Sequence, residues 1–230
     1  MERLLEKLGA CSRRSRPLTI VDPGANDPRD IYSLMTGVIV PRPIAFVSTV
    51  NAAGSRNLAP FSFFTGVSAN PPVICFAPLR RGADSGRKDT LRNIEATGEF
   101  VVNVVSEEIA QQMNACSPEF PPDADEFEIS GLTPVASDLV RPPRVAESKV
   151  SMECRLLQIV GVSEKPLGGS LVIGEVLRFH IADGLMNEFR IDADELRAIG
   201  RMAGPEYVKT TERFSMVRPV VSATKTNPGL

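Results

Sequence analysis

The chain has 230 residues, 43% of them hydrophobic and 23% charged, with a formal net charge of −2. This composition is ordinary for a globular protein with a sizeable core, most simply one domain, and the near-neutral charge gives no reason to expect a nucleic-acid partner. Four scattered cysteines without a C-x-x-C pair argue against a metal site and against a disulfide framework, and no apolar run approaches the roughly 20 residues that span a membrane.

The N-terminal residues place leucines at helical spacing and then three arginines. No apolar segment follows these charges, so a secretory signal is not expected, and Glu2 and Glu6 count against a transit peptide. We therefore expect residues 1–25 to form an extension, either frayed or in contact with a partner, before a domain over 26–215 and a tail over 216–230. Free, buried thiols suit a reducing compartment, and we expect a cytoplasmic protein.

The first predicted strand is "PIAFVSTV" over residues 43–50, because β-branched and aromatic residues dominate it and the turn sequence "NAAG" follows. The next stretch, "NLAPFSFFTGVSANPP" over 57–72, sets three phenylalanines among small and hydroxylated residues and closes on two prolines. So much ring surface on a short segment indicates that it faces a flat or bulky object. "PVICFA" over 72–77 is a short apolar run between prolines and predicts a buried strand.

Residues 79–88 form a basic, glycine-containing loop ahead of a predicted helix. Asp89 is placed to cap this short helix, "TLRNIEAT", which stops at Gly98. "EFVVNVV" predicts the next strand. Ser106 is placed to cap a second helix, "EEIAQQMNAC", whose acidic first turn suits the helix dipole.

Residues 117–148 hold several prolines and two acidic clusters, which predicts a long excursion rather than a regular element. The sequence "KVSMECRLLQIVGV" then alternates apolar and polar residues until Leu156 and Leu157, where the broken period predicts a bulge or bend. A hairpin-like connection, "SEKPLGGS", leads to a partner strand over 171–181. A short helix near 192–199, a loop and an extended tail complete the chain.

Six or more strands in consecutive hairpins, with two or three short helices inserted, do not fit a doubly wound α/β fold. The pattern favours a mainly β protein built as a closed or nearly closed antiparallel barrel, since closure removes exposed strand edges. The change of period and the glycines within strands fit a sheet that is forced to curve.

Several standard sites are missing from the sequence. No G-x-G-x-x-G follows a strand and no Walker A sequence occurs, so a Rossmann or P-loop nucleotide site is not expected. No G-x-S-x-G elbow occurs, and a single histidine in the whole chain leaves little room for a hydrolytic triad.

What remains is a pairing of the aromatic segment with the basic loop. Lys88 and Thr90 flank the predicted helix start, where free N–H groups and a partial positive charge suit a phosphate. A planar, polar-edged ring linked to a phosphate would satisfy both the segment and the loop. A solvated surface loop, together with phenylalanines that fill the barrel, is the alternative interpretation.

The segments "VPRPIAFVSTVNAAGSRNLAPFSFFTGVSANPP", "KDTLRNIEATGEFVVNVVSE", "MNACSPEFPPDADEFEISGLTPV" and "PPRVAESKVSMECRLLQIV" resemble the flavin reductase-like family with the FMN-binding split barrel, near the flavoredoxins. The resemblance keeps the same order from about Tyr32 to Tyr207 and covers most of the chain. It implies an antiparallel split β-barrel with a few short helices.

The resemblance also implies a homodimer that binds FMN non-covalently near the subunit interface. In family terms, Ser48 and Thr49 lie at the ribityl and phosphate end, the segment 57–62 lies along the ring, and Lys88 and Thr90 hold the phosphate. Phe46 stands where the family often has tryptophan, so a hydrogen bond from that position is not expected. The implied cofactor-binding residues are Phe46, Ser48, Thr49, Asn57, Leu58, Ala59, Pro60, Phe61, Ser62, Lys88 and Thr90.

The activity that the resemblance implies is hydride transfer from NADH or NADPH to the flavin, followed by electron transfer to free flavin, a partner monooxygenase or another redox protein. The flavin performs this chemistry, so no catalytic acid or base is required from the protein. Two alternatives stay open at this point. In the first, the chain is a non-enzymatic FMN electron carrier that is reduced by a redox protein. In the second, its flavin pocket acts on a small organic substrate.

Four further residues have both a functional and a structural interpretation. Arg42, between two prolines, would meet phosphate or substrate, or would equally fix the strand start by a salt bridge. His180 is a candidate proton donor on the nicotinamide side of the pocket, although a lone histidine in a strand is more often structural. Asn93 and Asn103 are within reach of the pocket, but roles within the helix and the strand explain them as well.

Overall fold

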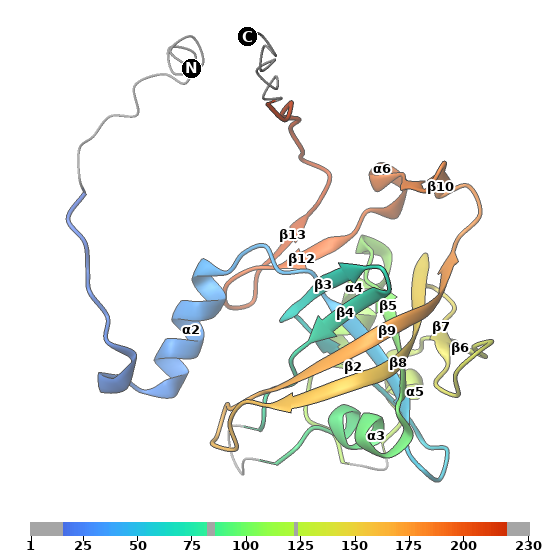
Figure 1. Ribbon diagram of the computed structural model, residues 1–230, viewed down its shortest axis with the longest axis horizontal. Coiled ribbons are helices and arrows are strands. Elements are labelled where there is room, and N and C mark those ends of the chain that lie inside the picture. The colour runs from blue at the N-terminus through green and yellow to red at the C-terminus, as the bar shows by residue number, and fades with distance from the viewer. Residues whose placement is uncertain (1–15, 82–85, 122–123, 220–230) are drawn as a thin grey trace, which may run out of the picture.

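The computed structural model describes residues 16–81, 86–121 and 124–219 (Figure 1). Its centre is one antiparallel sheet of seven strands in the order β2-β1-β5-β8-β9-β4-β3. These strands are β1 (Ala45–Val50), β2 (Arg56–Phe61), β3 (Phe64–Ala69), β4 (Pro72–Phe76), β5 (Glu99–Val104), β8 (Val150–Gly161) and β9 (Ser170–Ile181). The prediction of a mainly β, antiparallel fold is confirmed.

The sheet curls because its two outermost strands are neighbours along the chain. β2 ends at Phe61 and β3 begins at Phe64, yet the two strands lie at opposite edges of the sheet. A link this short spans only about 10 Å when it is fully extended. The two edges must therefore lie close together, and the sheet bends into a barrel that stays split between β2 and β3.

Bulges in the longest hairpin supply part of this curvature. The pairing of β8 with β9 shifts register between Glu153 and Cys154 and again between Leu156 and Gln158. The predicted bulge at Leu156–Leu157 is therefore confirmed. The extra residue is Leu177 on β9 at the first shift and Leu157 on β8 at the second. Each bulge increases the local twist, which allows the hairpin to wrap around the barrel.

The barrel interior is filled by side chains of the inward-facing positions. Three phenylalanines form its centre, with the Phe61 and Phe76 ring centroids 5.2 Å apart and the Phe76 and Phe100 centroids 5.5 Å apart. Ala45 and Val47 of β1 join the same cluster. Phe61 thus fills the barrel, as the alternative interpretation of the aromatic segment held.

A second core cluster covers the outer face of β1. Phe46 packs there with Ile109, Met113 and Phe127, and all four side chains are buried. Because helices cover this face, β1 is buried at all six positions. A strand with two buried faces shows a continuous run of apolar residues rather than alternation. This explains why "PIAFVSTV" was predicted to be a strand although it does not alternate.

The remaining elements are short. They are η2 (Pro23–Ala25), α2 (Pro28–Val38), α3 (Asp89–Thr97), η3 (Glu107–Ile109), α4 (Ala110–Ala115), α5 (Glu126–Ser130), β6 (Pro134–Val135), β7 (Arg144–Val145), β10 (Met186–Asn187), β11 (Arg190–Ile191), α6 (Ala193–Leu196), β12 (Ile199–Arg201) and β13 (Tyr207–Lys209). The expectation of an excursion without elements over 117–148 is wrong, since α5 and the β6–β7 pair lie within it. The loop expected after residue 199 is a hairpin of β12 and β13.

One predicted helix cap differs from the structure, and a second, Ser106, stands at the predicted N-cap position without a side-chain capping bond. The N-cap of α3 is Lys88 rather than Asp89, and the Asp89 carboxylate instead pairs with Arg92 and lies 3.4 Å from Arg81. Ser106 precedes η3, but its buried hydroxyl has no hydrogen-bond partner among the described residues. The predicted stop at Gly98 is confirmed, since this residue has a φ of 72° and closes α3 in the left-handed conformation.

Both ends of the described chain extend away from the barrel, and α2 stands off to one side of the sheet (Figure 1). The predicted helical leucines of the N-terminus lie outside the described residues. Within the described part of the chain, no helix has the length and apolar character needed to cross a membrane.

The close packing of Gly174 against Phe100 inside the barrel can be tested by substitution. A Cβ atom built on Gly174 of β9 would lie 2.4 Å from Cζ of Phe100, whereas one built on Gly161 of β8 would meet nothing within 4 Å. We expect Gly174→Ala to lower the free energy of unfolding by about 1–3 kcal/mol, and Gly161→Ala to change it by less than about 0.5 kcal/mol. Urea unfolding of both variants checks this, and equal stabilities would contradict it.

Candidate functional site

Most of the residues predicted for the flavin lie around one small cavity beside β2. The cavity has a volume of about 60 Å³. Six predicted residues line it, namely Asn57, Ala59, Pro60, Phe61, Lys88 and Thr90. The other lining residues are Arg81, Asp89, Cys116, Ser117, Pro118, Glu119, Phe120 and Glu126. The structure thus brings the aromatic segment and the basic loop together.

One side of this cavity is the free edge of the sheet, which β2 provides. The Leu58 N–H donates to Glu126 Oε2 at 3.0 Å instead of pairing with β1. The backbone polar groups of successive residues point to opposite sides of an antiparallel strand. Those of Leu58 and Pro60, two positions apart, therefore both point away from β1. Pro60 has no N–H to leave unpaired, which makes it well suited to an edge strand. The outward carbonyls of these two residues are acceptors along the free edge, and Pro60 also lines the cavity.

A buried polar network fixes the start of this edge. Asn57 donates from Nδ2 to Glu126 Oε1 at 2.9 Å, and its Oδ1 accepts from the hydroxyl of Thr90 at 2.7 Å. The Thr49 hydroxyl lies 3.3 Å from the same Oδ1, and Asn93 Nδ2 donates to Thr49 at 3.0 Å. All five side chains are buried. The network ties β1, β2, α3 and α5 to one another, and it gives Asn93 its structural role.

Glu126 is the residue that the sequence interpretation missed. It begins α5 and is only 6% exposed, and burial raises the pKa of its carboxyl group even though Leu58 and Asn57 donate to it. A capping pattern was present in the sequence. Asp125 accepts from the Phe127 N–H, and Gly131 ends α5 at a φ of 71°. The surrounding prolines obscured this five-residue helix.

The cationic end of the cavity is formed by Lys88 and Arg81. Lys88 Nζ lies 2.8 Å from Glu119 Oε1, and Arg81 Nη2 lies 3.4 Å from Asp89 Oδ2. Arg81 Nε is buried without a hydrogen-bond partner among the described residues, and Glu119 Oε2 lies 3.9 Å from it. A further acceptor in the cavity would satisfy this donor.

Five of the predicted residues do not line this cavity, and four of them lie deeper in the fold. Ser48 is fully buried and donates to the Pro143 carbonyl at 2.5 Å, and Phe46 lies in the second core cluster. Thr49 belongs to the polar network. Leu58 is buried beside Phe46 and contributes its backbone alone to the edge.

Ser62 lies at the other end of the edge, next to a second cavity of about 240 Å³ that also contacts Tyr32, Arg201 and Tyr207. Arg42 points toward this region, with Nε 3.5 Å from the Ser62 hydroxyl. Its guanidinium is buried and donates to the carbonyls of Thr36, Ile39 and Met202. Arg42 therefore fixes the strand start to the end of α2 through carbonyls rather than through a salt bridge.

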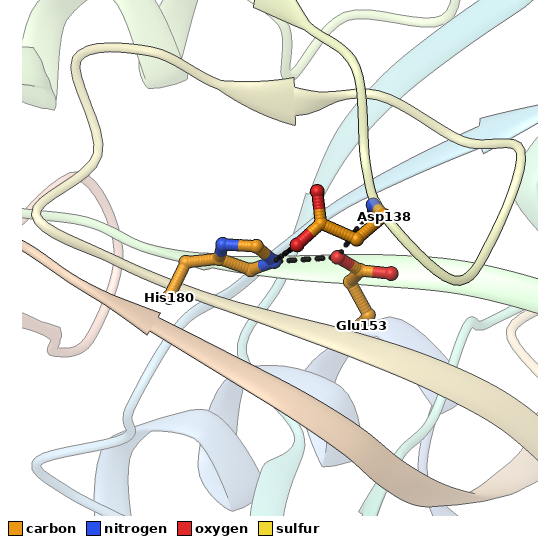
Figure 2. A group of neighbouring side chains, drawn as sticks. All are labelled: Asp138, Glu153 and His180. Atoms are coloured by element: carbon orange, nitrogen blue, oxygen red, sulfur yellow. Dashed lines mark hydrogen bonds and ion pairs between the residues drawn. The ribbon is translucent and has the colours of Figure 1, made fainter.

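His180 lies in a different cluster, together with Glu153 and Asp138 (Figure 2). His180 Nε2 hydrogen-bonds with Glu153 Oε1 at 2.5 Å, and the Asp138 carboxylate is 4.0 Å away. The backbone N–H groups of Asp138, Leu139 and Val140 also donate to the fully buried Glu153 carboxylate, at 2.6–3.2 Å. With four donors, the Glu153 oxygens are satisfied without a metal ion.

This arrangement gives His180 a structural task, which is to help hold the loop over 138–140 against β8. His180 does not line the cavity beside β2. Asn103 serves the same end of the barrel: its Oδ1 accepts from Ser151 and from the Val145 N–H, and its Nδ2 donates to the Phe46 carbonyl. The structural interpretation of Asn103 is confirmed, and the role of His180 as a proton donor stays a prediction.

Comparison with known proteins adds a family to this geometry. A family model described as "Flavin reductase like domain" matches residues 36–195. The structure of nitrilotriacetate monooxygenase component B from Bacillus cereus is 38% identical, with a TM-score of 0.83 over 88% of this chain and 100% of that chain. That of 2-nitrobenzoate 2-nitroreductase NbaA from Pseudomonas fluorescens is 32% identical, with a TM-score of 0.80 over 90% and 100%.

The fold also has a more distant match. A structure from Shewanella frigidimarina, described as having a split barrel domain, is 21% identical, with a TM-score of 0.76 over 88% of this chain and 100% of that chain. At this identity the likeness concerns the fold alone. It agrees with the split between β2 and β3.

The Glu153 cluster predicts an acid-sensitive contact. Burial alone would raise the pKa of Glu153, but hydrogen bonds from Asp138, His180 and Leu139 bring it below its ordinary value. A carboxyl whose pKa is lower in the folded state stabilises the fold above its unfolded pKa of about 4.3 and loses this contribution as pH falls further. We expect Glu153→Gln to lower the free energy of unfolding at pH 7 by about 1–3 kcal/mol.

The variant should also lose less stability than the parent between pH 6 and pH 3, because it lacks the titrating group. Urea unfolding across this range measures both effects, with Glu175→Gln as the control, since Glu175 forms a cross-strand ion pair with Arg155 outside the cluster. Parallel pH profiles for the parent and Glu153→Gln would contradict the assignment.

Proposed function

The chain belongs to the flavin reductase-like domain family, and from this premise we propose that it binds FMN along the edge of β2 and passes electrons from NADH or NADPH to an acceptor. The observation that carries the proposal is the convergence of Asn57, Ala59, Pro60, Phe61, Lys88 and Thr90 on one cavity. These residues come from β2 and from the start of α3, which are separated by about 30 positions in the sequence.

The phosphate end of the proposed site consists of Lys88, Arg81 and the first turn of α3. Two cations beside a helix N-terminus suit a dianion, because charge-assisted hydrogen bonds and the helix dipole act in the same direction. The buried Arg81 Nε without a partner is a donor that such a phosphate would satisfy. Thr90 already donates to Asn57, so we assign it the role of orienting Asn57.

The ring end of the proposed site consists of the outward edge of β2. A flat heterocycle lying there would meet the carbonyls of Leu58 and Pro60, with Ala59 and Ser62 offering little side-chain bulk. Phe46, Ser48 and Thr49 would act from behind, by holding β1 and β2 in place. The bound flavin would supply the hydride and electron chemistry, so the protein contributes binding, orientation and electrostatics.

A homodimer is part of the proposal. The exposed apolar side chains on α2, such as Val38 at 69% exposure, and on the C-terminal segment, such as Phe214 and Val217, form surfaces that a second copy of the chain would cover. Tyr32 of α2 and Tyr207, which precedes the C-terminal segment, both line the cavity next to Ser62. A dimer assembled through α2 and the C-terminal segment would complete the site near the interface.

The electron acceptor is proposed from the similarity to a monooxygenase component B, which favours a partner monooxygenase supplied with reduced flavin. The similarity to NbaA favours a second candidate, reduction of a small organic substrate. An apolar cavity of about 450 Å³ between α2, Phe63, Leu79 and the β8–β9 turn would accommodate an aromatic substrate. The third candidate function is an FMN electron carrier that is reduced by another redox protein.

The first test is the visible spectrum of the purified protein reconstituted with FMN. We expect a flavin absorption band that bleaches under anaerobic conditions when NADH or NADPH is added. A carrier would keep its band with both nicotinamides and lose it with a reduced redox protein. Failure to retain FMN after reconstitution would contradict the proposal itself.

The second test concerns the phosphate end. We expect Lys88→Gln to weaken FMN binding by about tenfold or more, because a charge-assisted contact to the phosphate is lost. Titration of protein into FMN, followed by flavin fluorescence, measures the dissociation constant. Arg87→Gln is the matched control, since Arg87 pairs with Glu95 and does not line the cavity. Equal affinity of Lys88→Gln and the parent would place the phosphate elsewhere.

A further inference from the structure

The cavity proposed for the flavin phosphate carries more acidic than basic side chains. Among the described residues that line it, two cations, Lys88 and Arg81, face three carboxylates, Asp89, Glu119 and Glu126. A dianionic phosphate that entered this arrangement unchanged would meet repulsion from the excess negative charge. An anion meets less repulsion if one of the carboxylates moves away from the two cations.

The contacts of the three carboxylates differ. Glu126 is buried and holds both the Leu58 N–H and Asn57, so it is fixed by the fold. Asp89 sits in the first turn of α3 and pairs with Arg92 as well as Arg81, so its charge is balanced within the helix. Neither can leave without loss of structure.

Glu119 is different in both position and exposure. It lies between α4 and α5, its side chain is 43% exposed, and its ion pairs are with the two cavity cations: Lys88 Nζ at 2.8 Å and Arg81 Nε at 3.9 Å. A partly exposed ion pair of this kind is weak, so a stronger anion can replace it. The Glu119 carboxylate stands where an oxygen of a phosphate would meet the same two cations.

We propose that Glu119 is an internal competitor for the flavin phosphate and so a specificity-determining residue of the site. This inference rests on the proposed function, in that the ligand is taken to be a phosphorylated flavin. The competition acts on charge: FMN must displace Glu119 from Lys88 and Arg81, whereas riboflavin, which has no phosphate, leaves this ion pair in place.

The competition also has a consequence for exchange of the flavin. When a phosphate leaves, Glu119 returns to Lys88 and to Arg81 Nε, so the Lys88 ammonium keeps an anionic partner in a partly buried site. This lowers the free energy of the empty site and weakens FMN binding relative to a site without Glu119. A weak, exchangeable flavin suits a reductase that delivers reduced flavin to another protein.

The experiment compares the parent with Glu119→Gln, using FMN and riboflavin as probes. We expect Glu119→Gln to lower the dissociation constant for FMN by about 3- to 10-fold, because the competing charge is removed and the side-chain size is kept. The dissociation constant for riboflavin should change by less than about twofold. Both constants come from fluorescence titration of the full chain at fixed ionic strength.

Two controls make the result specific. Glu95→Gln removes one negative charge from α3 next to the cavity, but Glu95 pairs with Arg87 and does not line the cavity, so its FMN affinity should match the parent. In the double variant Lys88→Gln/Glu119→Gln, the gain in FMN affinity from Glu119→Gln should be smaller than the gain from the same substitution in the parent. Lys88 and Glu119 pair with each other, so the effects of the two substitutions are not additive.

Each outcome separates the inference from the function it rests on. If the parent binds no FMN, the proposed function itself fails. If the parent binds FMN and Glu119→Gln binds it no more tightly, the competition is wrong while the flavin site stands. An equal gain for FMN and riboflavin would also overturn the inference, because it would mean that Glu119 acts through the shape of the segment rather than through its charge.

Discussion

The free edge of the barrel depends on one buried carboxylate. Glu126 accepts the Leu58 N–H and the Asn57 amide, and this is the contact that satisfies a strand edge which no other strand pairs. An unpaired buried N–H is costly, and an unpaired buried carboxylate is costlier still. Each group therefore requires the other, and together they hold α5 against β2. This contact helps to position the edge of β2 along which we propose that the flavin ring lies.

A second buried carboxylate performs the corresponding task on the other side of the barrel. Glu153 in β8 accepts three successive backbone N–H groups from 138–140 together with His180. The long segment between α4 and β8 is thus fixed at two points, once through its own Glu126 and once through Glu153. Glu119 lies between the end of α4 and the first of these points, where it reaches Lys88 while its side chain stays 43% exposed.

These constraints connect fold to proposed function through the two residues that link β2 and β3. The short link keeps the barrel split, the split leaves β2 with an outward edge, and the edge offers backbone carbonyls to a planar ligand. Pro60 fits this edge because it has no N–H to satisfy. Strand geometry and ligand site are therefore two consequences of the same topology.

The sequence by itself determined the architecture and the parts of the site that are local in the chain. Alternation, the broken period at Leu156–Leu157 and the stop at Gly98 are properties of neighbouring residues, so they could be read directly. The motif around Asn57 and that around Lys88 carried the family resemblance. Their meeting in one cavity was predicted from their chemistry and is seen in the structure.

Only the tertiary structure decided the charges and partners within the site. Glu126 and Glu119 lie some 30 to 70 positions from the groups they contact, in a proline-rich segment without periodicity, so no local pattern linked them to Asn57 or Lys88. The same holds for His180, whose partner Glu153 lies 27 positions away across a bulged hairpin. Contacts between distant residues depend on how the barrel closes, and that closure is a property of the whole chain.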